Sequence, residues 1–131
     1  AQDPKLKAAF ETHKEETEGQ IERLKQVFEL IGKRAQGKTC DAIEGILSEG
    51  EEILEEFKGT PALDAGLLAA AQAVEHYEIS RYGTLRAWAK QLGLKEAVTL
   101  LEETLAEESK TDETLTTLTT TAVNSAAKKA A

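Results

Sequence analysis

The sequence predicts an all-α protein, folded as one antiparallel helical bundle over residues 1–131. Apolar residues make up 40% of the chain, with Ala and Leu foremost, and aromatic residues only 5%, which favours helices. Long segments also repeat apolar side chains every three or four residues, the spacing of one face of a helix. Glycines separate these segments, and nothing in the composition indicates a sheet.

The first helix is expected over residues 4–31, because Asp3 is a good N-cap and Pro4 suits the first helical position. Gly32 or Gly37 should end it. Its inward stripe is apolar at both ends and polar in the middle: Leu6, Phe10, His13, Thr17, Gln20, Leu24, Val27 and Ile31. A flanking stripe contains Ala9, Glu16, Arg23 and Leu30.

A shorter helix is expected over residues 39–57, with Thr39 as its N-cap. Gly45 and Gly50 each lower its helix propensity by about 1 kcal/mol relative to alanine. This segment is therefore interpreted as a connecting element, and the break at residues 59–61 follows it.

The chain is organised around the next helix, expected between Pro61 and Gly93 and about 45 Å long. Its inward stripe consists of Leu68, Ala71, Glu75, Glu78, Tyr82, Leu85, Ala89 and Leu92. Two of these residues are glutamates, one turn apart at the middle of the helix. A carboxylate in such a stripe must be paired, protonated or bound to a metal, because burying it alone costs several kcal/mol.

The last helical region is expected over residues 94–125, as one helix or as two with a break at residues 109–113. Its inward stripe contains Ala97, Leu101, Thr104, Glu108, Thr111, Leu115 and Leu118. The Thr-rich run 114–121 is poor helix material, because β-branched side chains lose rotamer freedom in helices. Leu115 and Leu118 are nevertheless three residues apart, which indicates a helix rather than a strand.

The net charge of −8 and the lack of a Lys/Arg cluster argue against a nucleic-acid partner. No apolar run approaches the ~20 residues that span a bilayer, so no membrane partner is expected. The single cysteine, Cys40, excludes an internal disulfide and fits a reducing compartment, which predicts a cytoplasmic protein.

Three helices each place carboxylates at the middle of an apolar stripe: Glu16 beside His13, Glu75 with Glu78, and Glu108. Helical bundles that hold two metal ions use inward glutamates and histidines from facing helices. Oxygen ligands with one or two imidazoles suit iron or manganese, and zinc less specifically.

A simpler interpretation stays open for each residue taken alone. A glutamate on a helix of an acidic protein is usually solvated, and His13 could be a hydrogen-bonded core histidine. His76 points away from Glu75 and fits a surface position. Tyr82 is expected to bond to a ligand carboxylate, and Trp88 to pack under the connecting helix or in a dimer contact.

Three stretches also carry a family resemblance. Residues 13–24 follow His-x-x-Glu-Thr-x-x-Gln-x-x-Arg-Leu, residues 69–79 contain Val-Glu-His-Tyr-Glu-Ile, and Tyr-Gly-Thr-Leu follows at 82–85. With Thr-Leu-x-Glu-Glu-x-x-Thr-Asp at 104–112, they resemble the YciE/YciF family of bacterial ferritin-like proteins over essentially the whole chain.

The resemblance implies a ferritin-like four-helix bundle with a short extra helix, a dinuclear iron or manganese centre, a homodimer and a bacterial stress response. Glu75 and Glu78 resemble the Glu-x-x-Glu of rubrerythrin-type third helices. Glu16 and Glu108 match the carboxylates of the second and fourth helices. Ferritin-like proteins usually have a histidine three residues after these last two, where this chain has Gly19 and Thr111. This departure puts His13 as a direct ligand in question.

The function expected from residues and resemblance together is metal binding through Glu16, Glu75, Glu78 and Glu108, with His13 as a further ligand. An activity at such a centre would be oxidation of Fe(II) or consumption of peroxide. The alternatives are metal binding without turnover, and a non-catalytic helical protein whose glutamates pair with Arg23, Arg81 or Arg86.

Members of the resembled family begin with a further helix, ahead of the segment that starts at Asp3, and this chain lacks it. An apolar groove with Leu24, Val27, Leu68 and Leu85 should therefore lie open and need a cover. The first candidate is the chain's own preceding helix, trimmed or untraced in this sequence. The second is a helix of a second copy, and the third is the connecting helix folded across the gap.

Overall fold

The structure is a computed structural model that describes residues 1–130, and it confirms the all-α bundle. Its elements are α1 (Pro4–Leu30), α2 (Asp41–Glu56), α3 (Leu63–Gln91), α4 (Lys95–Leu118), the π-helical turn η1 (Thr119–Val123) and α5 (Asn124–Ala130). No strand occurs in residues 1–130. Within the same range, no helix is both long enough and apolar enough to cross a membrane.

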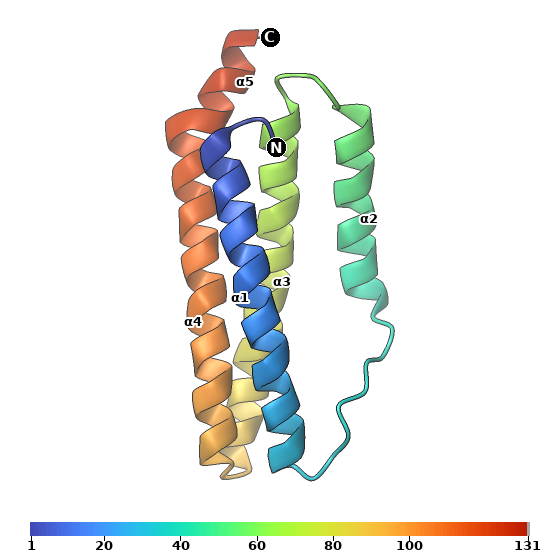
Figure 1. Cartoon of the computed structure of the whole chain (residues 1–131), viewed down its shortest axis with the longest axis vertical. Coiled ribbons are helices and arrows are strands. Elements are labelled where there is room, and N and C mark those ends of the chain that lie inside the picture. Colours follow the sequence, from blue (N-terminus) through green and yellow to red (C-terminus); the bar gives the residue numbers. More distant parts are fainter. Residues whose placement is uncertain (131) are drawn as a thin grey trace.

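The three long helices form an antiparallel bundle in which α4 is the shared neighbour (Figure 1). α1 and α3 run in the same direction and α4 runs in the opposite one. α4 packs against both, whereas α1 and α3 face each other across a diagonal. Gly32 and Gly93 follow the ends of α1 and α3 at φ of 66° and 72°, a left-handed conformation that glycine adopts without steric cost.

The start of α1 is tied to the start of α3. Asp3 caps α1, as predicted, by accepting hydrogen bonds from the backbone N–H groups of Lys5 and Leu6. The carboxylate of Asp64, itself buried, accepts the N–H of Gln2 at 2.7 and 2.9 Å and also the N–H of Asp3. The first residues of the chain are thereby fixed to the first turn of α3.

The connecting helix α2 packs chiefly along the first half of α3 and does not fill the predicted groove. Its Gly50 and Ile53 lie close to Ala70 and Gly66 of α3. None of its side chains is fully buried, and Leu47 and Leu54 are exposed. The prediction that this helix could cover the gap is therefore wrong. Thr39 is not its N-cap either, because α2 begins one residue later, with Cys40 at that position.

An open apolar groove of about 230 Å³ lies between the second halves of α1 and α3, floored by α4. Its walls include Val27, Ile31, Leu85, Trp88 and Leu92. Trp88 is 62% exposed and Leu92 72% exposed, so the tryptophan does not pack under α2, and the end of the α3 stripe faces solvent. The reason is geometric: no described helix occupies the corner between α1 and α3.

α4 continues without a break through residues 109–113, and the Thr-rich run is helical, as predicted. Five threonines of this run donate their hydroxyls to backbone carbonyls four residues earlier, which satisfies these polar groups inside the helix. They are Thr114, Thr117, Thr119, Thr120 and Thr121. The π-helical turn then places Val123 in the core beside Leu115 and Leu118.

The core consists of two apolar clusters. One contains Leu6, Leu68, Leu115, Leu118 and Val123, and the other contains Tyr82, Ala89, Ala97 and Leu101. Four polar side chains, Gln20, Glu75, Thr104 and Glu108, are buried on the stripes between these clusters. The bundle therefore has a polar layer near the middle of its length.

Candidate metal centre

Four potential metal ligands converge in this polar layer from three helices. His13 comes from α1, Glu75 and Glu78 from α3, and Glu108 from α4. One ligand atom of each lies within 4.8 Å of the ligand atoms of all the others. Glu75 and Glu108 are buried, while His13 and Glu78 are half-buried. The group is therefore compact enough for all four side chains to reach the same ion or pair of ions.

Three buried ligand atoms in this group have no hydrogen-bond partner among the described residues. His13 Nε2 lies 3.2 Å from Glu75 Oε1, but His13 Nδ1, Glu75 Oε2 and Glu108 Oε2 are unpaired. Leaving a buried polar atom unpaired costs about 1–3 kcal/mol. Bound protons on the carboxyl groups or a cation would satisfy such atoms.

The electrostatics of the layer favour either bound protons or a cation. Burial raises the pKa of Glu75 from 4.5 to about 9, and a hydrogen bond and charge repulsion from Glu108 add to this shift. Burial and the charge of Glu108 raise the pKa of Glu78 to about 7. The cause is common to both: carboxylates that share a buried space cannot all ionise without a compensating charge.

Arginine does not supply that charge. Arg23 pairs with Glu103 at 3.2 Å through Nε and with Glu107 through Nη2, and not with the four converging side chains. Arg81 lies over the ring of Tyr77, 4.9 Å from its centroid. Among the described residues, no arginine forms an ion pair with Glu75, Glu78 or Glu108.

Glu16 is placed apart from the four residues that converge. It lies on α1 one turn from His13, but its Oε2 faces the hydroxyl of Thr111 at 3.4 Å. Together with Thr12, Lys110 and Thr114 it lines a small pocket of about 130 Å³ between α1 and α4. The structure thus brings together four of the five predicted ligands and leaves the fifth at the edge of the layer.

Of two residues near the centre, one agrees with its prediction and the other does not. His76 is 65% exposed and pairs with Asp112 at 3.0 Å, in agreement with a surface position. Tyr82 is buried one helical turn after Glu78, and burial and the charge of Glu78 raise its pKa to about 12. Its hydroxyl does not hydrogen-bond to Glu75, Glu78 or Glu108 among the described residues, so the predicted bond to a ligand carboxylate does not form.

The sequence did not predict the hydrogen bond between Gln20 and Glu108. Gln20 donates its amide to Glu108 Oε1 and, at 3.2 Å, to Glu107 Oε2. Its place in a polar mid-helix stripe was visible in the sequence. The pairing across 88 residues was not, because it depends on how α1 and α4 align.

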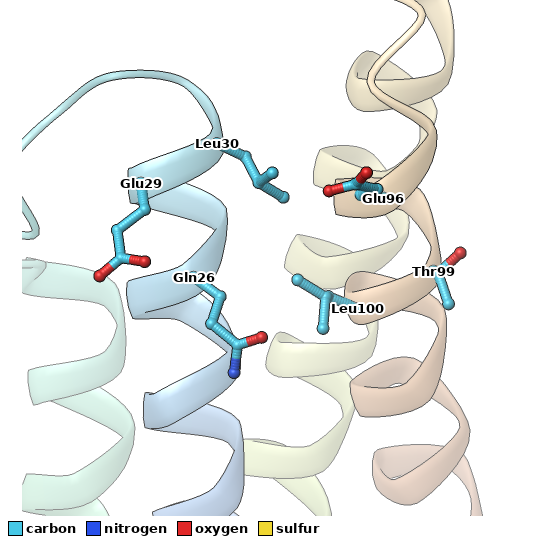
Figure 2. A pocket seen from close by; sticks show the side chains of 6 residues that line it. All are labelled: Gln26, Glu29, Leu30, Glu96, Thr99 and Leu100. Carbon is cyan, nitrogen blue, oxygen red and sulfur yellow. The ribbon is translucent and has the colours of Figure 1, made fainter.

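A pocket larger than the one beside Glu16 lies away from the candidate centre. It measures about 550 Å³ and lies between the last turns of α1 and the first turns of α4 (Figure 2). Gln26, Glu29 and Leu30 line it from α1, and Glu96, Thr99 and Leu100 line it from α4. It is open to solvent and includes none of the four converging residues, so it is separate from the candidate centre.

Comparison with known proteins identifies the family. The family described as "Domain of unknown function (DUF892)" matches residues 1–128. The chain belongs to the DUF892 family. Protein YciF of Escherichia coli (strain K12) is 49% identical over 102 residues, which are 77% of this chain and 61% of YciF. The chain thus spans about three fifths of the length of this curated relative.

Two solved structures share the DUF892 chain's fold. The crystal structure of the E. coli stress protein YciF superposes with a TM-score of 0.88 at 47% identity, covering 95% of this chain and 79% of that one. The structure of YcfI from Rhodopseudomonas palustris gives a TM-score of 0.86 at 45% identity, covering 89% and 74%. The resemblance to the YciE/YciF family and the all-α bundle are thereby confirmed.

Proposed function

We propose that this DUF892 chain is a metal-binding bundle whose centre holds one or two ions of iron or manganese through His13, Glu75, Glu78 and Glu108. The observation that carries this proposal is the convergence of four ligand atoms within 4.8 Å of one another. The resemblance to ferritin-like proteins of bacterial stress responses supports the same assignment. Glu16 is a predicted ligand that could join the set only if its side chain turned away from Thr111.

The residues present fit such an ion on two grounds. Three carboxylates and one imidazole form an oxygen-rich donor set, which suits iron or manganese better than zinc, since zinc favours nitrogen and sulfur ligands. The three unpaired buried atoms, His13 Nδ1, Glu75 Oε2 and Glu108 Oε2, are also lone-pair donors that a cation would satisfy.

A redox-active ion in this place would supply electron transfer to oxygen or peroxide, and the chain's own residues set the conditions for it. Without an ion, Glu75 holds a proton at neutral pH because its pKa is about 9. Glu75 would have to lose that proton in order to bind a cation through both of its oxygens. Burial by the apolar clusters on both sides limits the access of water to Glu75 and Glu108.

The test is a metal titration of the purified protein after chelation. We expect Mn²⁺ and Fe²⁺ to bind and to raise the melting temperature, since the unfolded chain cannot assemble the ligands. Glu75→Gln and Glu78→Gln should abolish that increase, whereas Glu113→Gln, an exposed position on α4, should leave it unchanged. Wild-type protein that binds neither ion would refute the proposal.

Oxygen uptake after addition of Fe²⁺ distinguishes turnover from binding alone. Consumption above that of free Fe²⁺, lost in Glu75→Gln, supports oxidase or peroxidase chemistry. Tight binding with no uptake supports metal binding without turnover. The remaining alternative, a helical protein with glutamates paired to arginine, is disfavoured because Arg23 and Arg81 are engaged elsewhere.

A further inference from the structure

Gln20 is the only side chain of α1 other than Leu6 that is fully buried, and its amide nitrogen has two acceptors. It donates to Glu108 Oε1, within the converging group, and to Glu107 Oε2 at 3.2 Å, outside it. A carboxamide has two ends of nearly equal shape, one a donor and the other an acceptor. Which end faces Glu108 therefore needs a cause.

That cause is the neighbouring Glu107, which Arg23 holds in place. Arg23 Nη1 donates to Glu107 Oε2 at 2.8 Å, and Nη2 bonds to Glu107 Oε1. The guanidinium is itself held by Thr104 Oγ1 at 3.0 Å and by Glu103 at 3.2 Å. A carboxylate fixed in this way accepts hydrogen bonds and donates none, so the amide nitrogen of Gln20 must face it.

The second N–H of the same nitrogen is then directed to Glu108. It occupies Glu108 Oε1 and leaves Oε2 without a donor in the described part of the chain. With the opposite amide orientation, a carbonyl oxygen would face a carboxylate oxygen and repel it. The orientation of one amide thus decides which oxygen of Glu108 is available.

We propose that Gln20 is a positioning residue that, oriented by the Arg23-bound Glu107, presents Glu108 to the metal ion through Oε2. This inference rests on the proposed metal-binding function and adds the side chains that prepare one ligand. Hydrogen-bonding partners of a metal ligand typically change affinity or activity 10- to 100-fold when they are removed. A Gln20 that only filled space would have no such effect once its volume was preserved.

The test measures Mn²⁺ affinity by calorimetry, and the visible absorption of Co²⁺ bound to the same site. We expect Gln20→Leu to lower the Mn²⁺ affinity roughly 10- to 100-fold and to change the Co²⁺ spectrum. Glu107→Ala should lower the affinity too. In the Gln20→Leu background, Glu107→Ala should have no further effect, because both substitutions remove the same hydrogen-bonded chain.

Glu103→Ala is the matched control, since Glu103 also pairs with Arg23 and carries the same charge but does not contact Gln20. It should lower the affinity much less than Glu107→Ala does, because Arg23 keeps its bonds to Glu107 and Thr104. Unchanged binding and an unchanged spectrum in Gln20→Leu would overturn the inference. So would independent effects of Gln20→Leu and Glu107→Ala that multiply in the double variant.

The outcomes separate this inference from the proposed function. Wild-type protein that binds no Mn²⁺ overturns both, whereas tight binding by wild type and Gln20→Leu alike overturns only the role of Gln20. Circular dichroism of each ion-free variant verifies its folding. If Gln20→Leu fails to fold, the contrast between Glu107→Ala and Glu103→Ala decides the question: equal effects of the two overturn the inference.

Discussion

Replacing Glu75 by glutamine should remove much of the pH dependence of stability in the ion-free protein. The pKa of Glu75 is about 9 in the folded protein, against an ordinary value of 4.5. Between these values the folded state keeps a proton that the unfolded state has lost. A raised carboxyl pKa means that stability falls as the pH rises from about 4.5 towards 9.

One retained proton corresponds to about 1.36 kcal/mol per pH unit, so the loss from pH 5 to pH 8 is about 4 kcal/mol. For a chain of this size 1 kcal/mol shifts the melting temperature by roughly 4 °C, which gives a decrease of roughly 15 °C. Glutamine cannot ionise, so this part of the decrease, which comes from Glu75 alone, should be absent from Glu75→Gln. The part that remains is due to Glu78, whose pKa is about 7.

Thermal melts followed by circular dichroism, in the presence of a chelator at pH 5, 6, 7 and 8, measure this difference. Glu113→Gln serves as the control and should follow the wild type. Added Mn²⁺ should stabilise wild-type protein increasingly with pH, because the ion competes with protons for the same carboxylates. Parallel pH profiles of wild type and Glu75→Gln would refute the buried, protonated Glu75.

Three further predictions concern other parts of the bundle. In calorimetry, Tyr82→Phe should alter the Mn²⁺ affinity more than Trp88→Phe does, because Tyr82 is buried next to the carboxylates and Trp88 is 62% exposed. The reverse order would contradict the assignment of Tyr82 to the inward stripe of α3. Gly66→Ala should destabilise the protein by about 1–3 kcal/mol in urea unfolding, because the new Cβ would lie 2.5 Å from Ile53 Cγ2. Gly83→Ala is the control: it has open space around it and should stabilise the protein by up to about 1 kcal/mol. These 131 residues expressed alone should self-associate through the apolar groove. In size-exclusion chromatography, Trp88→Ser should shift the elution volume towards that of a 14.2 kDa monomer, and a monomeric wild type would contradict the prediction.

The level at which the candidate ligands meet could be predicted from periodicity alone. Three stripes, each polar only in its middle, bring their polar parts together once the helices pack side by side. His13, Glu75 and Glu108 follow directly from that pattern. Glu16 did not, because it belongs to the flanking stripe of α1, which directs its side chain to the edge of the layer beside Thr111.

Other features could not be predicted because they depend on relations between helices. The contact of Arg23 with Glu107 joins residues 84 positions apart, and its geometry follows from the alignment of α1 with α4. The exposure of Leu92 depends on the corner that no described helix occupies, although its spacing places it on the inward stripe. Periodicity reports which face of a helix is apolar, but not whether a neighbour covers that face.

The hydrogen bonds between Asp64 and the backbone of Gln2 and Asp3 set the relative height of two of the four converging side chains. α1 and α3 run in parallel from these bonds, and His13 and Glu75 follow them by ten and eleven residues. At about 1.5 Å per residue, both side chains lie roughly 15–16 Å along their helices and arrive at the same height. One carboxylate at the end of the bundle thus aligns His13 and Glu75 along its length. A single residue inserted between Asp3 and His13 would offset them by about 1.5 Å and turn the imidazole by about 100°.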